Sequence, residues 1–214
     1  MLITISRQFG AGGSEVARAV AHRLGWTVLD DELVNEIAAR SGLTPEEVAS
    51  LDERTPSFVE RLARSNAFPH PDLLIPAPEL IEEPEEAKLA RITREVVSDL
   101  GRRNRLVLVG RSAAAILARQ EDVLHVRLVA SKEFRTRVAI ERRGVDPGQA
   151  ARVVEETDRS RRRFHREFYG RDWDDPTNYH MVLNTERLGF EGAAGVIALR
   201  ARELGWAEPA PAGA

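Results

Sequence analysis

"LITISRQFGAGGSEVARAVAHRLG" occupies residues 2–25, and this stretch decides the fold class. Its first part, residues 2–6, is a short apolar run rich in β-branched residues, which predicts a buried parallel strand. From residue 13 to residue 24 apolar side chains recur at helical spacing, and Gly25 predicts the helix end. A strand that leads through glycines into a helix is typical of the first βα unit of an α/β fold.

Three glycines stand where the predicted strand becomes the predicted helix, at Gly10, Gly12 and Gly13. Glycine-freed backbone N–H groups at a helix N-terminus predict a site for phosphate oxygens, and the hydroxyl of Ser14 could reach a phosphate or a magnesium ion. The full P-loop pattern GxxxxGK[ST] is not met, because Gly13 stands at the lysine position and Arg7 at the position of the first glycine. The alternative is a tight turn that needs glycine only for close packing.

The alternation of strand and helix continues along the chain. Four more strands are predicted, at residues 26–30, 105–110, 123–130 and 179–185, with helices between them. The later helices are expected over residues 132–143, 146–169 and 190–204. Prolines between residues 56 and 84 interrupt this rhythm and predict an irregular insertion, which a helix over residues 85–100 follows. The pattern predicts a five-stranded parallel sheet covered by helices on both faces. Ligands of such sheets bind at the carboxyl ends of the strands.

Composition narrows the function classes. The chain has 214 residues, 43% of them hydrophobic and 30% charged, as in an ordinary soluble domain. It has no cysteine and no apolar run of membrane-spanning length, so we expect a cytoplasmic protein without a membrane partner. The net charge of -3 argues against general nucleic-acid binding. A nucleic-acid-binding helix bundle is therefore the weakest interpretation. The oligomeric state is left open.

Two more strand ends carry polar residues. Asp30 and Asp31 follow the second predicted strand, where a carboxylate either contacts a substrate hydroxyl or metal-bound water, or caps the next helix. Gly110 and Arg111 follow the third predicted strand, where the guanidinium binds phosphate or carboxylate oxygens, or forms a structural salt bridge.

The densest cluster of charge is "ETDRSRRRFHREFYGRDWDD", residues 156–175, with five arginines between residues 159 and 166. Four of them share one helix face, and Arg161 points elsewhere. Arginines this close repel one another unless an anion offsets them, and a triphosphate or the charge that develops in phosphoryl transfer would do so. A solvated helix surface is the alternative. Trp173 is expected to pack rather than to stack on a base.

With the glycine loop, Gly110-Arg111 and the arginine helix in this order, the chain resembles the cytidylate kinase-like family of P-loop proteins, over roughly residues 2–204. The resemblance implies an NMP-kinase-like domain at residues 1–204. Within it lie an acceptor-side helical insertion over about residues 45–100 and an arginine-rich lid over about residues 131–170. Residues 205–214 are expected to form a disordered tail. In this family the phosphate loop commonly lacks lysine.

The resemblance also implies roles for residues. ATP would be held by residues 10–14 and by Arg135, at the start of the lid, and Mg²⁺ by Ser14. The run Asp158-Arg159-x-Arg161 would act in catalysis with Arg111, which also holds the acceptor. Beyond the resemblance, we expect Arg7 to supply the charge that the missing lysine would have given. Substrate contacts fall to Asp30 and Asp31. The residues that the resemblance assigns to ATP are Gly10, Ala11, Gly12, Gly13, Ser14 and Arg135.

The sequence therefore predicts an ATP- and Mg²⁺-dependent nucleotide kinase-like phosphotransferase that acts on a small acceptor, with a nucleoside monophosphate such as CMP as the first candidate. The acidic residues that flank Gly-Arg in cytidylate kinases are absent here, since Val109 precedes it and Ser112 follows it. These departures leave one alternative open. The chain would then be a catalytically inactive nucleotide- or phosphometabolite-binding protein of the same fold.

Overall fold

The computed structural model describes residues 1–46, 48 and 85–207. Its centre is a sheet of five parallel strands in the order β2-β3-β1-β4-β5. The strands are β1 (Leu2–Arg7), β2 (Thr27–Leu29), β3 (Leu106–Val109), β4 (Val123–Val129) and β5 (Met181–Asn184). The predicted five-stranded parallel sheet is thus confirmed.

The strand order places the end of β1 at a switch point. From β1 the chain crosses to β2, beyond β3, whereas from β3 it crosses to β4 on the opposite side of β1. Adjacent strands whose connections leave in opposite directions open a crevice at their carboxyl ends, where ligands of such sheets bind. The glycine-rich loop and Gly110-Arg111 lie at this crevice because they follow β1 and β3.

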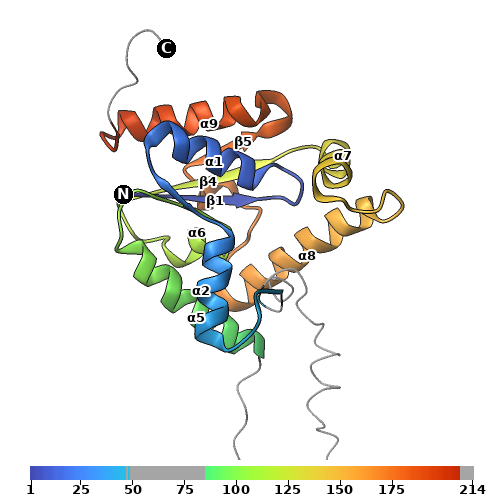
Figure 1. Ribbon diagram of the computed structural model, residues 1–214, viewed down its shortest axis with the longest axis horizontal. Helices are drawn as coiled ribbons and strands as arrows, with labels where there is room; N and C mark the ends of the chain where they lie inside the picture. Colours follow the sequence, from blue (N-terminus) through green and yellow to red (C-terminus); the bar gives the residue numbers. More distant parts are fainter. Residues whose placement is uncertain (47, 49–84, 208–214) are drawn as a thin grey trace, which may run out of the picture.

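Helices cover both faces of the sheet (Figure 1). On one face α1 (Gly13–Leu24) and α9 (Thr185–Glu203) pack side by side through Val20, Ala194 and Ile197. On the other face lie α2 (Asp31–Ser41), α5 (Glu85–Gly101) and the short α6 (Ala113–Ile116). Strands buried on both faces read as continuous apolar runs, which is why the sequence revealed them.

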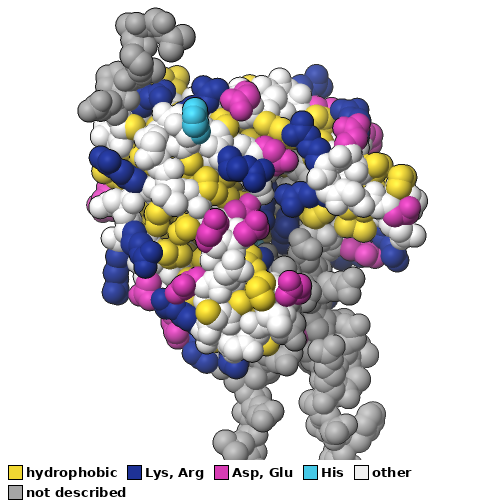
Figure 2. Space-filling model, viewed as in Figure 1, with side chains coloured by type: hydrophobic (Ala, Val, Ile, Leu, Met, Phe, Trp, Pro, Cys, Tyr) yellow, Lys and Arg dark blue, Asp and Glu magenta, His cyan; other side chains and the backbone are white. Residues whose placement is uncertain are grey.

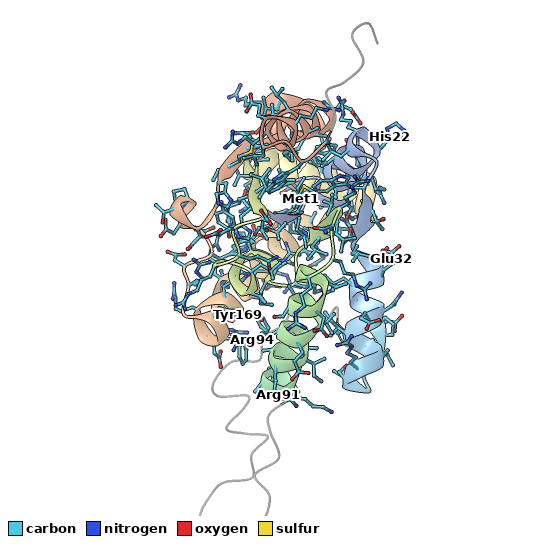
Figure 3. The ribbon with its side chains drawn as sticks, turned by 90° about the vertical axis from the view of Figure 1, so that its left-hand side faces the viewer. Met1, His22, Glu32, Arg91, Arg94 and Tyr169 are labelled. Carbon is cyan, nitrogen blue, oxygen red and sulfur yellow. The ribbon has the colours of Figure 1, made fainter. Side chains whose placement is uncertain are left out.

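Two further helices lie at the carboxyl end of the sheet. They are α7 (Lys132–Arg143) and α8 (Ala150–Tyr169), and α8 runs back toward α5 and α6 (Figure 1). At the far end of α8 the Arg94 guanidinium of α5 lies 5.5 Å from the centre of the Tyr169 ring and donates to the carbonyl of Phe168. Figure 3 shows Arg94 and Tyr169 next to each other, below the amino ends of the strands marked by Met1. Helix α8 is thus fixed to the core at its far end.

Several predicted boundaries shift. Helix α8 begins at Ala150 and not at residue 146, and α9 begins at Thr185 and bends at Gly189, whose φ is 69°. The folded chain also passes residue 204, because Trp206 stacks on Trp26 with ring centres 6.4 Å apart. The proline-rich insertion at residues 56–84 and residues 208–214 of the predicted tail lie outside the described residues. Among the helices that are described, none is long and apolar enough to cross a membrane.

A pair of histidines lies between β1, β4 and β5. The His125 ring is stacked on that of His180 with centres 5.1 Å apart, and its Nδ1 is 2.8 Å from the Thr4 hydroxyl. Burial, together with the nearby His180, lowers the pKa of His125 to about 4. His125 is therefore neutral in the folded protein over the whole physiological range.

Candidate active site

The glycine-rich loop connects β1 with α1 through two residues in the left-handed region. Gly10 has a φ of 79° and Gly12 a φ of 76°, which side chains rarely allow. A Cβ at Gly10 would also lie 2.4 Å from the carbonyl oxygen of Arg135, and one at Gly12 would lie 2.3 Å from the Phe190 ring. Close packing by α7 and α9 therefore explains these two glycines.

The same loop leaves donors for an anion. Gly12 is the N-cap of α1 and offers no side-chain hydrogen bond to the first turn. The first N–H groups of a helix have no acceptor inside the helix, so those of Gly13 and Ser14 face outward. A cavity of about 50 Å³ lies beside this turn, and it is lined by Arg7, Gln8, Phe9, Gly10, Gly12, Gly13, Glu15, Val138, Arg143 and Arg161. The glycines of the tight turn therefore also line this cavity.

Ser14 and Asp30 meet at the mouth of this loop. The Ser14 hydroxyl donates to Asp30 Oδ2 at 2.5 Å, and Arg143 Nη2 lies 3.4 Å from the same hydroxyl. Asp30 precedes α2, but its side chain makes no capping hydrogen bond to that helix. Its carboxylate is directed to the loop instead, while Asp31 is exposed.

A larger cavity of about 530 Å³ opens beside this pair. Its walls come from the loop, α1, α2 and the end of α7, and are lined by Arg7, Ser14, Glu15, Arg18, Asp30, Asp31, Val34, Asn35, Pro45, Glu46, Arg111, Arg142 and Arg143. In Figure 2 dark-blue Lys and Arg side chains gather along the hollow between the α7 side of the molecule, on the right, and the α1–α2 side. Charge of both signs on its walls suits a polar, anionic molecule.

Arg111 is one of the residues that the structure brings to both the crevice and this cavity. It has a φ of 48°, uncommon for a residue with a side chain, and its Nη1 donates to the carbonyl of Val48 at 3.1 Å. The neighbouring Ser112, with a φ of 51°, lies 3.3 Å from His165 Nε2 of α8. The unusual backbone turns Arg111 toward the carboxyl ends of the strands, as the strand-end argument predicted.

Asp158 of α8 connects α7 and α8 to the glycine-rich loop. Its carboxylate accepts from the Phe9 N–H at 2.9 Å and from Arg135 Nη1 at 2.6 Å, and only 2% of its side chain is exposed. Arg135 also donates to the carbonyl of Phe9 at 3.2 Å. Both side chains therefore hold α7 and α8 against the loop; the family resemblance assigned Asp158 to catalysis and Arg135 to ATP.

The arginines of α8 divide into two groups. Arg161 is buried, donates from Nη1 to the carbonyl of Arg7 at 3.1 Å, and lines the cavity over the loop. Arg159 is exposed and lines neither cavity. Arg161 thus points away from the four arginines that share the other helix face, as predicted. It is Arg161, and not those four, that faces the loop.

Two arginines, Arg143 and Arg127, were not predicted from the sequence. Arg143, the last residue of α7, lines both cavities, and no motif indicates it. Arg127 of β4 is buried, with its guanidinium 4.0 Å from the centre of the Trp173 ring, and it pairs with Asp174, which also pairs with Arg162 of α8. Trp173 is 2% exposed, so its predicted packing role is confirmed.

The oxygen donors at the loop fit a magnesium ion. Ser14 Oγ and Asp30 Oδ2 are the hydroxyl and carboxylate oxygens that Mg²⁺ prefers, and their hydrogen bond shows that both point to one place. Within residues 1–46, 48 and 85–207 there is no group of three or more His, Asp or Glu suited to a metal. A magnesium ion held largely by substrate phosphates and water needs no such group.

The family model and the curated relatives that match this chain all concern cytidylate kinases or proteins like them. The model of the cytidylate kinase-like family matches residues 2–187 of the chain. Cytidylate kinase of Methanopyrus kandleri is 25% identical over 196 residues, covering 87% of this chain and 86% of that protein. Cytidylate kinase of Archaeoglobus fulgidus is 24% identical over 209 residues, covering 95% and 96%.

Solved structures show the same fold at low identity. An uncharacterized protein from Eubacterium ventriosum has a TM-score of 0.62 at 19% identity, covering 94% of this chain and 98% of that one. A shikimate kinase from Bacteroides thetaiotaomicron has a TM-score of 0.55 at 17% identity, covering 95% and 97%. These likenesses establish the P-loop kinase fold.

Proposed function

Because the chain belongs to the cytidylate kinase-like family, we propose that it is a phosphotransferase that moves the γ-phosphoryl group of ATP to a small acceptor. CMP is the first acceptor to test, since two relatives that match nearly the whole chain are named cytidylate kinases. Their identities of 25% and 24% leave the acceptor to experiment.

The observation that carries this proposal is the meeting of two cavities. The small one lies over the N-terminus of α1, the large one lies beside Asp30, and Arg7, Glu15 and Arg143 line both. A phosphoryl group that passes from a donor to an acceptor needs two such sites with cations where they join. A protein that only binds a nucleotide needs one.

Each residue of the junction has a task in this mechanism. The N–H groups of Gly13 and Ser14 bind phosphate oxygens of the donor at the positive end of the α1 dipole. Arg161 and Arg7 stabilise the negative charge that develops on the transferred group. Arg111 orients the acceptor from the other side of the crevice, and Asp30 contacts its hydroxyl. Asp158 and Arg135 act as positioning residues, because they contact the loop and not the cavity over it.

Ser14 and Asp30 are the residues that would hold Mg²⁺. The ion, when bound, neutralises phosphate charge and fixes the phosphate orientation. Residues of α7 and α8 cover the cavity over the loop and limit the access of water to the transferred group. Asp30 and Arg143 keep the Ser14 hydroxyl in place.

ATP turnover with a panel of nucleoside monophosphates tests the proposal. We expect turnover with at least one acceptor, and we expect Arg161→Ala to lower kcat about 10³-fold. Arg159→Ala, on the exposed side of α8, is the matched comparison, and its loss is expected to be far smaller. Turnover no greater than without protein for every acceptor would refute the kinase proposal. Calorimetric ATP binding without any transfer would instead support the inactive nucleotide-binding protein.

A further inference from the structure

The two departures from the P-loop pattern touch each other. Arg7 stands where the pattern has its first glycine, and Gly13 stands where it has lysine. A Cβ built at Gly13 would lie 2.7 Å from Arg7 Cγ and 3.1 Å from its Cδ. The stem of Arg7 therefore occupies the space in which a lysine side chain at position 13 would begin.

The guanidinium of Arg7 ends at the neighbouring strand. A Cβ at Gly110, whose φ is 72°, would lie 1.8 Å from Arg7 Nη1. The side chain thus crosses the crevice from the end of β1, past the first turn of α1, to the end of β3. Three positions are coupled by this path, because Gly13 and Gly110 must both lack a side chain for Arg7 to take it.

Along this path Arg7 lines both cavities. They are the cavity over the loop and the cavity beside Asp30, and the carbonyl of Arg7 accepts from Arg161. A lysine at position 13 would supply its charge at the same crevice, from the helix side. An arginine there adds a fork of donors that a single ammonium lacks.

We propose an exchange between positions 13 and 7. The cation of the phosphate loop has moved from the first turn of α1, where Gly13 now leaves space, to Arg7, the last residue of β1. The ligand it serves is the phosphate chain of the nucleotide, so this part rests on the proposed function. The coupling between the two positions does not, because it is a property of the ligand-free protein. Arg7→Gly with Gly13→Lys turns residues 7–14 into GQFGAGKS, which satisfies GxxxxGK[ST].

The test is a double-mutant cycle on Arg7→Gly and Gly13→Lys, with melting temperature and the calorimetric Kd for ATP as separate readouts. Gly13→Lys alone is expected to lower the melting temperature by about 2–12 °C, because it overpacks against Arg7. Arg7→Gly alone is expected to raise the Kd for ATP at least about tenfold. The double variant is expected to recover both, with a Kd within about threefold of the wild type.

Controls separate the exchange from simpler effects. Arg7→Gly with Gly195→Lys adds a lysine on α9 of the same chain. A Cβ there would lie 3.8 Å from Arg23 and would have no Arg7 atom within 4 Å, so this variant must not recover ATP affinity. If Gly13→Lys does not fold, Gly13→Ala meets the same Arg7 atoms, and its destabilisation is expected to vanish when Arg7→Gly is added.

The outcomes distinguish the two proposals. Strictly additive losses of stability, or unchanged ATP affinity in Arg7→Gly, would overturn the exchange even if the protein is an active kinase. A coupled cycle with recovered ATP affinity, but no phosphoryl transfer to any acceptor, would uphold the exchange and refute the proposed function.

Discussion

The buried pair of Asp158 and Arg135 gives the sharpest prediction, because it joins both α7 and α8 to the loop. Asp158→Asn keeps the size of the side chain and an oxygen for the Phe9 N–H, but it removes the negative charge. The Arg135 guanidinium, 2.6 Å away and 7% exposed, is then a buried cation that has lost its carboxylate. We therefore expect a loss of stability and not only a loss of activity.

The size of the loss follows from the burial of the pair. Removing one partner of a buried ion pair costs about 3–5 kcal/mol, and we take the lower value because Asn can still accept one hydrogen bond. For a chain of this size, 1 kcal/mol corresponds to about 2–4 °C in melting temperature. Asp158→Asn is therefore expected to melt about 6–12 °C below the wild type.

Thermal unfolding followed by circular dichroism measures this difference. Glu155→Gln, on the same helix, is the matched control, since Glu155 pairs with Lys132 where both side chains are about half exposed. Its effect is expected to be small because water and salt screen such a pair. The double variant Arg135→Met/Asp158→Leu is expected to recover most of the loss. If Asp158→Asn melts within 2 °C of the wild type, or if the double variant recovers nothing, the argument from an unpaired buried charge is wrong.

Three other predictions concern the loop, the end of α7 and the histidine pair. Gly10→Ala is expected to cost more than Gly25→Ala in urea unfolding, because both have positive φ but only at Gly10 does the new Cβ meet a carbonyl, that of Arg135; equal costs would remove that contact from the argument. Arg143→Ala is expected to weaken ATP binding about tenfold in calorimetry and to leave the melting temperature unchanged, since its side chain is exposed; wild-type affinity would exclude it from the phosphate site. Burial lowers the pKa of His125 to about 4, so the unfolded chain takes up a proton at a higher pH than the folded chain does. Through His125 the free energy of unfolding is therefore unchanged above pH 6.5 and falls by about 3 kcal/mol as the pH drops to 4. His125→Asn is expected to flatten this slope in urea titrations, and an unchanged slope would assign it to other groups.

The sequence predicted the sheet because the information for it is local. Strands such as Leu106–Val109 are buried on both faces and read as unbroken apolar runs, and both ends of Gly13–Leu24 and Lys132–Arg143 follow from periodicity and a closing glycine. The start of α9 at Thr185 was not predicted, because the apolar period begins at residue 190, after the bend at Gly189. It depends on how the chain enters α9 from β5.

The candidate site was predictable where the sheet edge alone collects residues. Arg7, Asp30 and Arg111 each follow a strand, so a parallel sheet brings them together whatever the loops do. The inward position of Arg161, the burial of Asp158 and the approach of Arg143 depend on how α7 and α8 fold back over the loop. No spacing along the chain encodes that, because the partners of Asp158 are 23 and 149 residues away.

The position of the cations has a consequence for how phosphate binding is controlled. A lysine in the first turn of α1 is present whenever the loop is folded. Here the arginines that line the loop cavity come from β1, α7 and α8, so two of the three reach the cavity only when α7 and α8 are docked on the loop. The Asp158–Arg135 pair holds that docking, which means that Asp158→Asn is expected to weaken ATP binding as well as stability. In the variant Arg7→Gly/Gly13→Lys, whose cation sits on α1 itself, the same Asp158→Asn change is expected to cost less ATP affinity. Equal losses in the two backgrounds would show that the lid does not carry the charge to the loop.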